Sequence, residues 1–413
     1  MKNLFLFFII YFFLSCSERQ TKKPIKLPGS GRVHEMVRVT NPSPTILIPK
    51  DAIDNITITD SVISGKPYIS EEKFIPLDIK NGPIGTIDKI LFYKDHIYIA
   101  DRRINEAVFI YDTLGVSIHK INERGKGPKE YYGVGDICID TVKKELILED
   151  RLSKRRLFYD LNGQWRRTEV TKLNIMNIER MKNSTLYRSS YGQNWLIKEL
   201  EDYPLLSGIN DSIVYRGFRF LPYEKCDWDG GNIYRNYKDD IFYHPTYSDT
   251  IYSILSDSSY CVATYFKFDN SMFRKLASLT TGSIDIILKM RKENYQRFFD
   301  LTFQETNNSI LYGCVFETSM PIRNYLYNKI NKISYKLNNK VDFGVCRKLY
   351  STPISNFNNF YIGEIEAKRL CSYTKTLDKK KIEAKNPKLS EIISNIKEND
   401  NPVLLLYKFK FAN

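Results

Sequence analysis

The chain has 413 residues, of which 42% are hydrophobic, so it is long enough to bury a substantial core and its composition is not that of a disordered protein. Lysine and arginine number 62 against 48 aspartates and glutamates, which gives a formal net charge of +14. Seven cysteines without CxxC spacing and four scattered histidines argue against a zinc site, and they favour buried free thiols over a disulfide framework.

The first predicted element is an export signal. One lysine at position 2 precedes an unbroken apolar run from Leu4 to Leu14, which is too short to span a bilayer comfortably. The following Ser15-Cys16 resembles the lipobox of bacterial lipoproteins. That resemblance implies a signal peptide over residues 1–15 and lipid attachment at Cys16. The protein is then expected to bind the membrane through this lipid anchor. An ordinary secretory signal with an incidental cysteine is the alternative.

The next segment, residues 16–45, is rich in serine, proline, lysine and glycine, and it shows little periodicity. Such a composition predicts a lipidated N-terminus followed by a flexible tether. Ser17 follows the cysteine, and by the sorting rule of other Gram-negative lipoproteins this residue favours an outer-membrane lipoprotein that faces the periplasm or the cell surface.

The compartment also bears on the positive charge. A basic surface commonly indicates nucleic acid, but a protein tethered in the cell envelope meets little of it, so we expect no nucleic-acid partner. Phosphorylated lipid head groups, acidic glycans and acidic proteins remain as partners, and a merely solvated basic surface is the alternative.

An internal repeat then predicts the fold. Residues 97–115 and 146–163 share Asp-Arg, Tyr-Asp and a closing glycine at offsets of 48 to 49, and each copy reads as strand, turn, strand and turn. A period near 48 with several short strands per unit is typical of a β-propeller blade. Residues 46–413 have room for six such blades with insertions, although spacing alone also permits five or seven.

Later segments are consistent with degenerate blades. Aromatic and β-branched runs around residues 212–222, 240–255 and 260–269 read as strands. Helical periodicity predicts two short helical insertions, over residues 282–295 and 387–400. The final alternating run "VLLLYKFKF" is expected to pair with "EEKFIPLDI" near residue 75, because a propeller closes its ring in this way.

The glycine-rich loop of residues 122–136, "NERGKGPKEYYGVGD", raises the question of phosphate binding. A phosphate loop needs a helix N-terminus directly after its glycines, and the sequence after this loop is strand-like. We therefore expect a turn between consecutive blades, in which glycines supply positive φ and Pro128 fixes the bend.

Taken together, the lipobox, "KFIPLDI", "IGTIDKILFYKDHIYIADRR", "VFIYDTLG", "RGKGPKEY" and the ending "NPVLLLYKFK" resemble the six-bladed β-propeller lipoproteins of Bacteroidota, which are propellers of the TolB/NHL-like type. The resemblance covers about residues 65–410. It implies an all-β fold of six four-stranded antiparallel blades. At the loop the usual family pattern Gly-x-Gly-Pro-Gly-Glu-Tyr is matched except that Lys129 replaces the third glycine, which suggests a tolerant surface turn.

Six residues are candidates for a binding site. Asp101-Arg102 and Asp150-Arg151 recur in two blades and could gather around a central channel, where carboxylates could also bind calcium, but a repeated aspartate after a strand commonly accepts hydrogen bonds from the next turn. His244 lies at an aromatic strand end, and Trp228 lies in an Asp- and Gly-rich loop that could stack on a carbohydrate. No catalytic or metal-ligating residue is assigned, and no bound cofactor is expected unless channel carboxylates hold calcium.

These features favour a binding or scaffold module for an extracytoplasmic protein, peptide or glycan, and the sequence leaves open whether the protein is an enzyme. The alternative is a metal-dependent lyase or hydrolase with its site in the central channel, because the fold alone does not choose between them. Convergent polar side chains around a cation would favour the enzyme, and a channel filled by aromatic and aliphatic side chains would favour binding. A purely structural envelope protein would have no sizeable polar pocket.

Overall fold

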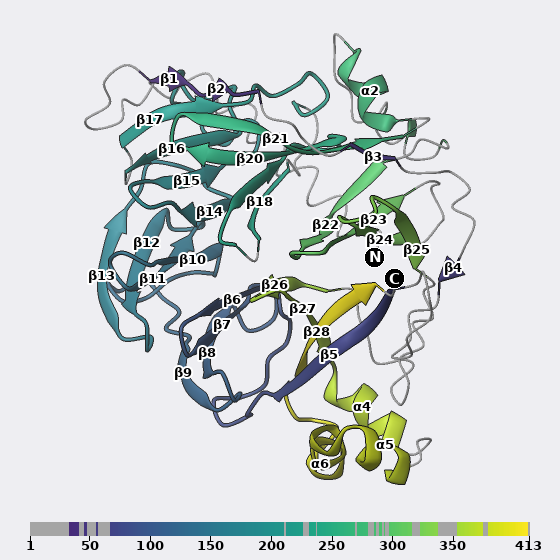
Figure 1. Cartoon of the computed structure of the whole chain (residues 1–413). Helices are drawn as coiled ribbons and strands as arrows, with labels where there is room; N and C mark the ends of the chain where they lie inside the picture. Colours follow the sequence, from purple (N-terminus) through teal and green to yellow (C-terminus); the bar gives the residue numbers. More distant parts are fainter. Residues whose placement is uncertain are drawn as a thin grey trace.

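The structure is a computed structural model of the chain. It describes residues 33–40, 45–47, 55–56, 67–209, 212–225, 231–236, 238–268, 271–279, 285, 289–290, 293, 297–315, 323–337, 353–374 and 379–411. The fold is a six-bladed β-propeller, which confirms the predicted class. Figure 1 shows the blades arranged in a ring.

Each blade has a core of four antiparallel strands, and we number the blades in chain order. Blade 1 contains β6 (Lys89–Tyr93), β7 (His96–Asp101), β8 (Ala107–Asp112) and β9 (Ser117–Ile121). Blade 2 contains β10 (Asp136–Asp140), β11 (Glu145–Asp150), β12 (Arg155–Asp160) and β13 (Trp165–Val170). Blade 3 contains β14 (Asn177–Arg180), β15 (Thr185–Arg188), β16 (Leu205–Ile209) and β17 (Ser212–Gly217).

The second half of the ring repeats this plan. Blade 4 contains β18 (Asn232–Arg235), β19 (Ile241–His244), β20 (Thr250–Ser256) and β21 (Ser259–Lys267). Blade 5 contains β22 (Arg297–Glu305), β23 (Ser309–Val315), β24 (Arg323–Asn328) and β25 (Ser334–Leu337). Blade 6 contains β26 (Ser355–Phe357), β27 (Phe360–Ile365), β28 (Val403–Phe411) and β5 (Pro67–Pro76).

The ring closes in blade 6 as predicted. The C-terminal strand β28 pairs antiparallel with the early strand β5, and the register runs from Val403 opposite Pro76 to Phe411 opposite Pro67. Because the two ends of the propeller domain are joined in one sheet, neither strand leaves an open edge on that side of the blade.

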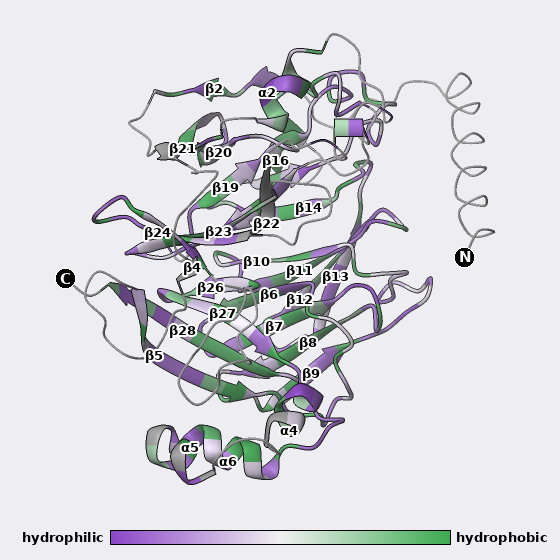
Figure 2. Cartoon of the chain, turned by 90° about the vertical axis from the view of Figure 1, so that its right-hand side faces the viewer, coloured by the Kyte–Doolittle hydropathy of each residue, from purple (hydrophilic) through white to green (hydrophobic). Residues whose placement is uncertain are grey.

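The hydrophobic core lies between neighbouring blades. Strands β7 and β11 are buried along almost their whole length, since both faces of a blade are covered by its neighbours. Between blades 1 and 2, Tyr98 and Ile110 share a cluster with Leu146 and Leu157. Figure 2 shows the matching hydrophobic stretches on the strands, with hydrophilic residues in the turns.

Buried tyrosines bring their hydroxyl groups to backbone acceptors. The Tyr98 hydroxyl donates to the carbonyl of Leu161 at 2.9 Å, which ties blade 1 to a turn of blade 2. The Tyr131 hydroxyl lies 2.9 Å from both the Glu106 and Ile121 carbonyl oxygens. These bonds spare Tyr98 and Tyr131 the cost of burying an unpaired hydroxyl group.

Short helices interrupt the sheets, and the structure gives the bounds of four of them in its described residues. These are α2 (Met272–Ala277), α4 (Ala367–Thr374), α5 (Lys379–Lys385) and α6 (Pro387–Asn395). Helix α6 confirms the second predicted helix: Asn386 caps it, and Leu389, Ile392 and Ile393 are buried. Helices α4 and α5 were not predicted. They pack with α6 beside blade 6 (Figure 1), in a hydrophobic cluster that also includes residues of blade 5.

The other predicted helix, over residues 282–295, falls mostly outside the described residues, but Asp285, Lys289 and Met290, which are described, are helical. A further helix, α2, begins ten residues before that range and is capped by the Ser271 hydroxyl. Sequence reasoning missed it because its single pair of buried residues, Met272 and Leu276, is too short a run to show helical periodicity.

The N-terminal segment does not stay separate from the propeller. We call four short strands the N-terminal strap: β1 (His34–Glu35), β2 (Val37–Arg38), β3 (Thr45–Leu47) and β4 (Asn55–Ile56). They pair in parallel with the outermost strands of blades 3, 4 and 5. The first two strap strands lie within residues 16–45, the range that we expected to be a tether.

The glycine-rich loop of residues 122–136 connects β9 of blade 1 to β10 of blade 2, as predicted. Of its glycines only Gly125 has a positive φ, at 155°. The Glu130 carboxylate accepts a hydrogen bond from the Gly127 amide at 2.7 Å, so the loop closes on its own side chain. A strand rather than a helix follows, and the loop therefore lacks the geometry of a phosphate loop.

Cys138 and Cys314 are buried free thiols, as expected, while Cys261 is buried and Cys371 is half-buried. Cys226 and Cys346 lie outside the described residues. Within the described part of the chain, no helix has the length and apolar character needed to cross a membrane.

Candidate functional site

The site is a cavity of about 1470 Å³ at the centre of the ring. It is lined by residues from the innermost strand of every blade, which are β6, β10, β14, β18, β22 and β26. Loops at both ends of these strands also contribute: Arg102 and Arg151 lie at one end, and Lys94 and Asn358 lie at the other. The cavity is therefore the central channel of the propeller. We call the end that carries Arg102 and Arg151 the arginine mouth.

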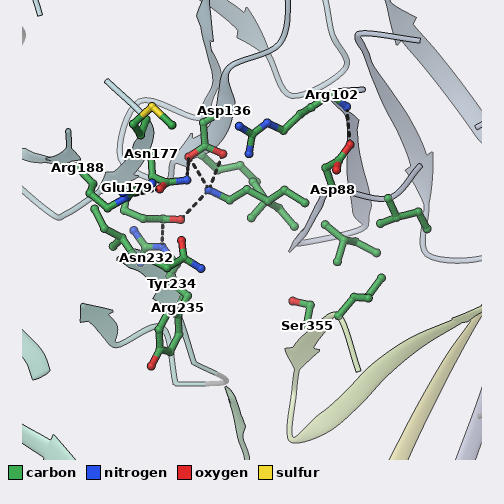
Figure 3. Close-up of a pocket in the computed structure, with 18 of the residues that line it drawn as sticks. Asp88, Arg102, Asp136, Asn177, Glu179, Arg188, Asn232, Tyr234, Arg235 and Ser355 are labelled. Carbon is green, nitrogen blue, oxygen red and sulfur yellow. Dashed lines mark hydrogen bonds and ion pairs between the residues drawn. The ribbon is translucent and has the colours of Figure 1, made fainter. Parts of the chain in front are cut away.

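A chain of ion pairs crosses the channel from blade 1 to blade 4 (Figure 3). The Lys89 ammonium lies 3.2 Å from both carboxylate oxygens of Asp136 and 2.9 Å from Glu179 Oε1. The other Glu179 oxygen lies 2.7 Å from Nε of Arg235. Asp136 also accepts the Ile178 amide at 2.8 Å, so its carboxylate joins blade 2 to blade 3.

These contacts hold both partners in their charged forms. Burial by itself would lower the pKa of the Lys89 ammonium, but the Asp136 and Glu179 carboxylates raise it above its ordinary value. Burial by itself would raise the pKa of the Glu179 carboxyl, but Lys89 and Arg235 lower it. At neutral pH the Glu179 carboxylate therefore holds no proton to donate as a general acid, and it is already bound to two cations.

The recurring Asp-Arg pairs divide into two roles. The fully buried Asp101 carboxylate accepts backbone amides on both sides of the blade, from Gly85 at 2.7 Å and from Ile104 at 3.0 Å. Asp150 likewise accepts the amides of Tyr132 at 2.8 Å and Leu152 at 3.2 Å. These contacts agree with the alternative interpretation, in which each aspartate accepts hydrogen bonds from the backbone amides of a turn.

The arginine that follows each aspartate does line the channel. Arg102 and Arg151 both border the cavity at the arginine mouth, whereas Asp101 and Asp150 do not. Each aspartate fixes the turn on which its neighbouring arginine is carried. Figure 3 shows Arg102 with its backbone nitrogen bonded to Asp88, at 2.8 Å, and its guanidinium directed toward the side of the channel where Asp136 lies.

His244 ends the second strand of blade 4, and it also lines the channel although its side chain is buried. Its Nε2 lies 2.6 Å from the Ser248 carbonyl oxygen, so this nitrogen donates to the backbone. A nitrogen that donates in this way is not available as a base. The remaining two candidates, Trp228 and the lipid-attachment residue Cys16, lie outside the described residues.

The opposite end of the channel is aromatic. Phe92 of blade 1 stacks on Phe357 of blade 6 with ring centroids 4.6 Å apart, and both rings are half-buried in the channel wall. Tyr93 lies beside them. The channel thus offers charged groups at one end and partly exposed aromatic rings at the other, which suits a ligand with both kinds of surface.

Sequence reasoning missed the residues of the ion-pair chain: Lys89, Asp136, Glu179 and Arg235. One signal was present in the repeat, because Lys89 and Asp136 are the first residues of equivalent innermost strands. The amino acid at this position differs from blade to blade, so a search for identical residues in the repeat does not detect it. Within the described residues, no group of three or more histidine, cysteine or acidic side chains has the arrangement of a metal site.

The fold and the open channel define the class of protein: a six-bladed β-propeller with a ligand-sized central channel. The chain belongs to the family described as "Domain of unknown function (DUF4934)", whose model matches residues 53–408. This membership agrees with the resemblance to Bacteroidota propellers that the sequence suggested. No curated protein matches the chain.

Two solved structures from Bacteroides resemble the chain. A Bacteroides fragilis protein that is predicted to be exported superposes with a TM-score of 0.66 at 16% identity, over 89% of this chain and 99% of that one. A Bacteroides vulgatus member of the DUF4221 family has a TM-score of 0.50 at 10% identity, over 84% of this chain and 99% of that one. At these identities the likeness shows the fold.

Proposed function

We propose that the protein is a lipid-anchored binding module of the cell envelope, which holds an extracytoplasmic peptide, glycan or protein segment in its central channel. The observation that carries the proposal is the channel itself: a cavity of about 1470 Å³, lined by all six blades, is large enough to hold a small ligand or a chain segment.

The charged groups inside the channel favour binding over catalysis. Asp136 and Glu179, which would be the natural acid–base pair, both contact Lys89, and Glu179 also contacts Arg235. A cation would have to displace the Lys89 ammonium to reach them. Calcium in the channel, and with it the lyase or hydrolase alternative, stays a prediction, which metal analysis of the purified protein would test.

The proposed location rests on the N-terminus and on one neighbour. The apolar run that ends at Ser15-Cys16 supports export and acylation of Cys16, Ser17 favours the outer membrane, and the Bacteroides fragilis neighbour is predicted to be exported. Metabolic labelling with an alkyne palmitate tests the anchor. We expect label on the full chain and none on the Cys16→Ala variant, whereas equal label on both would refute acylation at Cys16.

The binding function is tested on arrays of peptides and envelope glycans, with the purified full chain in detergent. Ser355 lies on β26 and lines the channel, so Ser355→Trp places an indole in the cavity (Figure 3). Val170 is 79% exposed on the outermost strand of blade 2, and Val170→Trp is the matched control. We expect the bound array features to disappear with Ser355→Trp and to persist with Val170→Trp. Features that survive the blocked channel would refute the proposal.

A further inference from the structure

The lining of the channel carries more positive than negative charge. The residues that line the described channel include seven basic and five acidic side chains, an excess of two positive charges. We therefore asked which basic side chains at the mouth have a carboxylate partner and which do not.

The acidic side chains at this end of the channel are each paired with a cation. Asp88 lies 2.6 Å from Nε of Arg103, and Glu106 lies 2.5 Å from Arg124. Asp136, deeper in the channel, is held by Lys89. Each of these three carboxylates that line the channel is therefore engaged by a basic residue other than Arg102 and Arg151.

Arg102 and Arg151 are two cations of the arginine mouth that no described carboxylate pairs with. Within the described residues, neither guanidinium has a carboxylate partner, and the one side-chain contact of the Arg151 guanidinium is with the Met176 sulfur, at 2.8 Å from NH1. The two arginines also repel one another: burial, and then the charge of Arg102, lower the pKa of Arg151. Two neighbouring guanidinium groups repel one another, and an anion bound between them would offset this repulsion.

The turns that present these arginines are rigid. Asp101 and Asp150 bind the backbone amides of the same turns, so the backbone from which each arginine side chain extends is held in place in two adjacent blades. A rigid scaffold lowers the entropy that is lost when a ligand binds. Guanidinium groups present planar pairs of donors that match the oxygens of carboxylate, phosphate or sulfate.

We propose that Arg102 and Arg151 form an oxyanion-binding site at the mouth of the channel, which receives a carboxylate, phosphate or sulfate group of the ligand. This inference rests on the proposed function, because it assigns the anionic part of the ligand to one end of the channel. The half-buried aromatic rings of Phe92 and Phe357 at the other end would then contact its planar or apolar part.

The test is isothermal titration of the full chain in detergent with three separate probes: sodium phosphate, sodium sulfate and sodium galacturonate. The test variant is Arg102→Gln/Arg151→Gln. The matched control is Lys80→Gln/Lys143→Gln, which removes the same two charges from exposed turns outside the channel lining. Circular dichroism establishes that both variants are folded.

We expect at least one probe to bind, to bind at least tenfold more weakly to the arginine variant, and to keep its affinity for the lysine control. The probe that binds best identifies the oxyanion. Equal affinity for both variants, or no binding of any probe, would overturn the inference. If array binding is still lost with Ser355→Trp in that case, the proposed function stands and only the arginine site is refuted.

Discussion

Asp249 gives the sharpest prediction about stability, because it is a buried carboxyl with an incomplete set of partners. It lies in the turn between β19 and β20, and its side chain is fully buried. One oxygen accepts the Ser271 hydroxyl at 2.6 Å. Among the described residues the other oxygen, Oδ1, has no hydrogen-bond partner. Burial raises the pKa of this carboxyl from 3.8 to about 6, although Ser271 and Arg274 act in the opposite direction.

The sign of the effect follows from proton binding. Between about pH 4 and pH 6 the folded protein holds a proton on Asp249 that the unfolded chain has lost, so the free energy of unfolding falls as the pH rises through this range. A difference of roughly two pKa units corresponds to about 3 kcal/mol at about 1.4 kcal/mol per unit. The full destabilisation is present above about pH 6 and absent below about pH 4.

The variant Asp249→Asn removes the charge and keeps an oxygen that can accept from Ser271. We expect it to be more stable than the wild type by up to about 3 kcal/mol at pH 7.5 and to match it at pH 4. Urea unfolding, followed by fluorescence at several pH values, measures the difference. Asp95→Asn, in an exposed turn of blade 1, is the control. A stability difference that does not change with pH, or a loss of stability at pH 7.5, would refute the reasoning.

Three further variants test the fold around the site by urea unfolding. Lys89→Met leaves the buried Asp136 and Glu179 carboxylates without their shared cation. We expect the free energy of unfolding to fall by about 3–5 kcal/mol at pH 7, and by less in acid. A decrease under about 1 kcal/mol would contradict the ion-pair chain. Met36→Ala removes a side chain that is 7% exposed and packs on Gly217, so it should cost about 2–3 kcal/mol, and an unchanged stability would show that the N-terminal strap does not dock. Gly115→Ala puts a side chain on a residue with a φ of 89° and places its Cβ 2.0 Å from the Pro76 carbonyl oxygen in the closing blade. We expect it to lower the free energy of unfolding by about 2 kcal/mol or more. An unchanged free energy of unfolding would contradict the tight contact between blade 1 and β5.

The regular part of the fold was predictable because its signals are local. The offset of 48 to 49 residues between the two Asp-Arg pairs identified the blade unit, and the alternation in "VLLLYKFKF" identified the strand that closes the ring. Two-residue turns such as Lys94-Asp95 follow directly from the spacing of the flanking strands.

The strap and the short helices were not predictable in the same way. A strap strand such as Val37–Arg38 has two residues, and it forms because the edge of β21 is available beside it. The helix over residues 367–374 is amphipathic but only eight residues long, which is too short for periodicity alone to identify it, and it is stabilised by packing against other parts of the chain. Tertiary contacts of this kind leave little trace in the sequence.

The candidate site was predicted in part. The repeat identified Asp101, Arg102, Asp150 and Arg151 together, but only the structure separates the aspartates, which bind backbone amides, from the arginines, which line the channel. The pairing of Lys89 with Glu179 joins blades 1 and 3, and residues 90 positions apart show no shared pattern in a single sequence.

The central claim is that the channel holds a ligand in the cell envelope, and photo-crosslinking from inside the channel tests it most directly. Tyr93 lines the channel, and replacing it with p-benzoyl-phenylalanine in the full chain places a reactive group there; the same replacement at the exposed Val170 is the control. We predict a defined crosslinked product from position 93 in intact cells that is absent from position 170. Equal products from both positions, or none from position 93, would contradict the account.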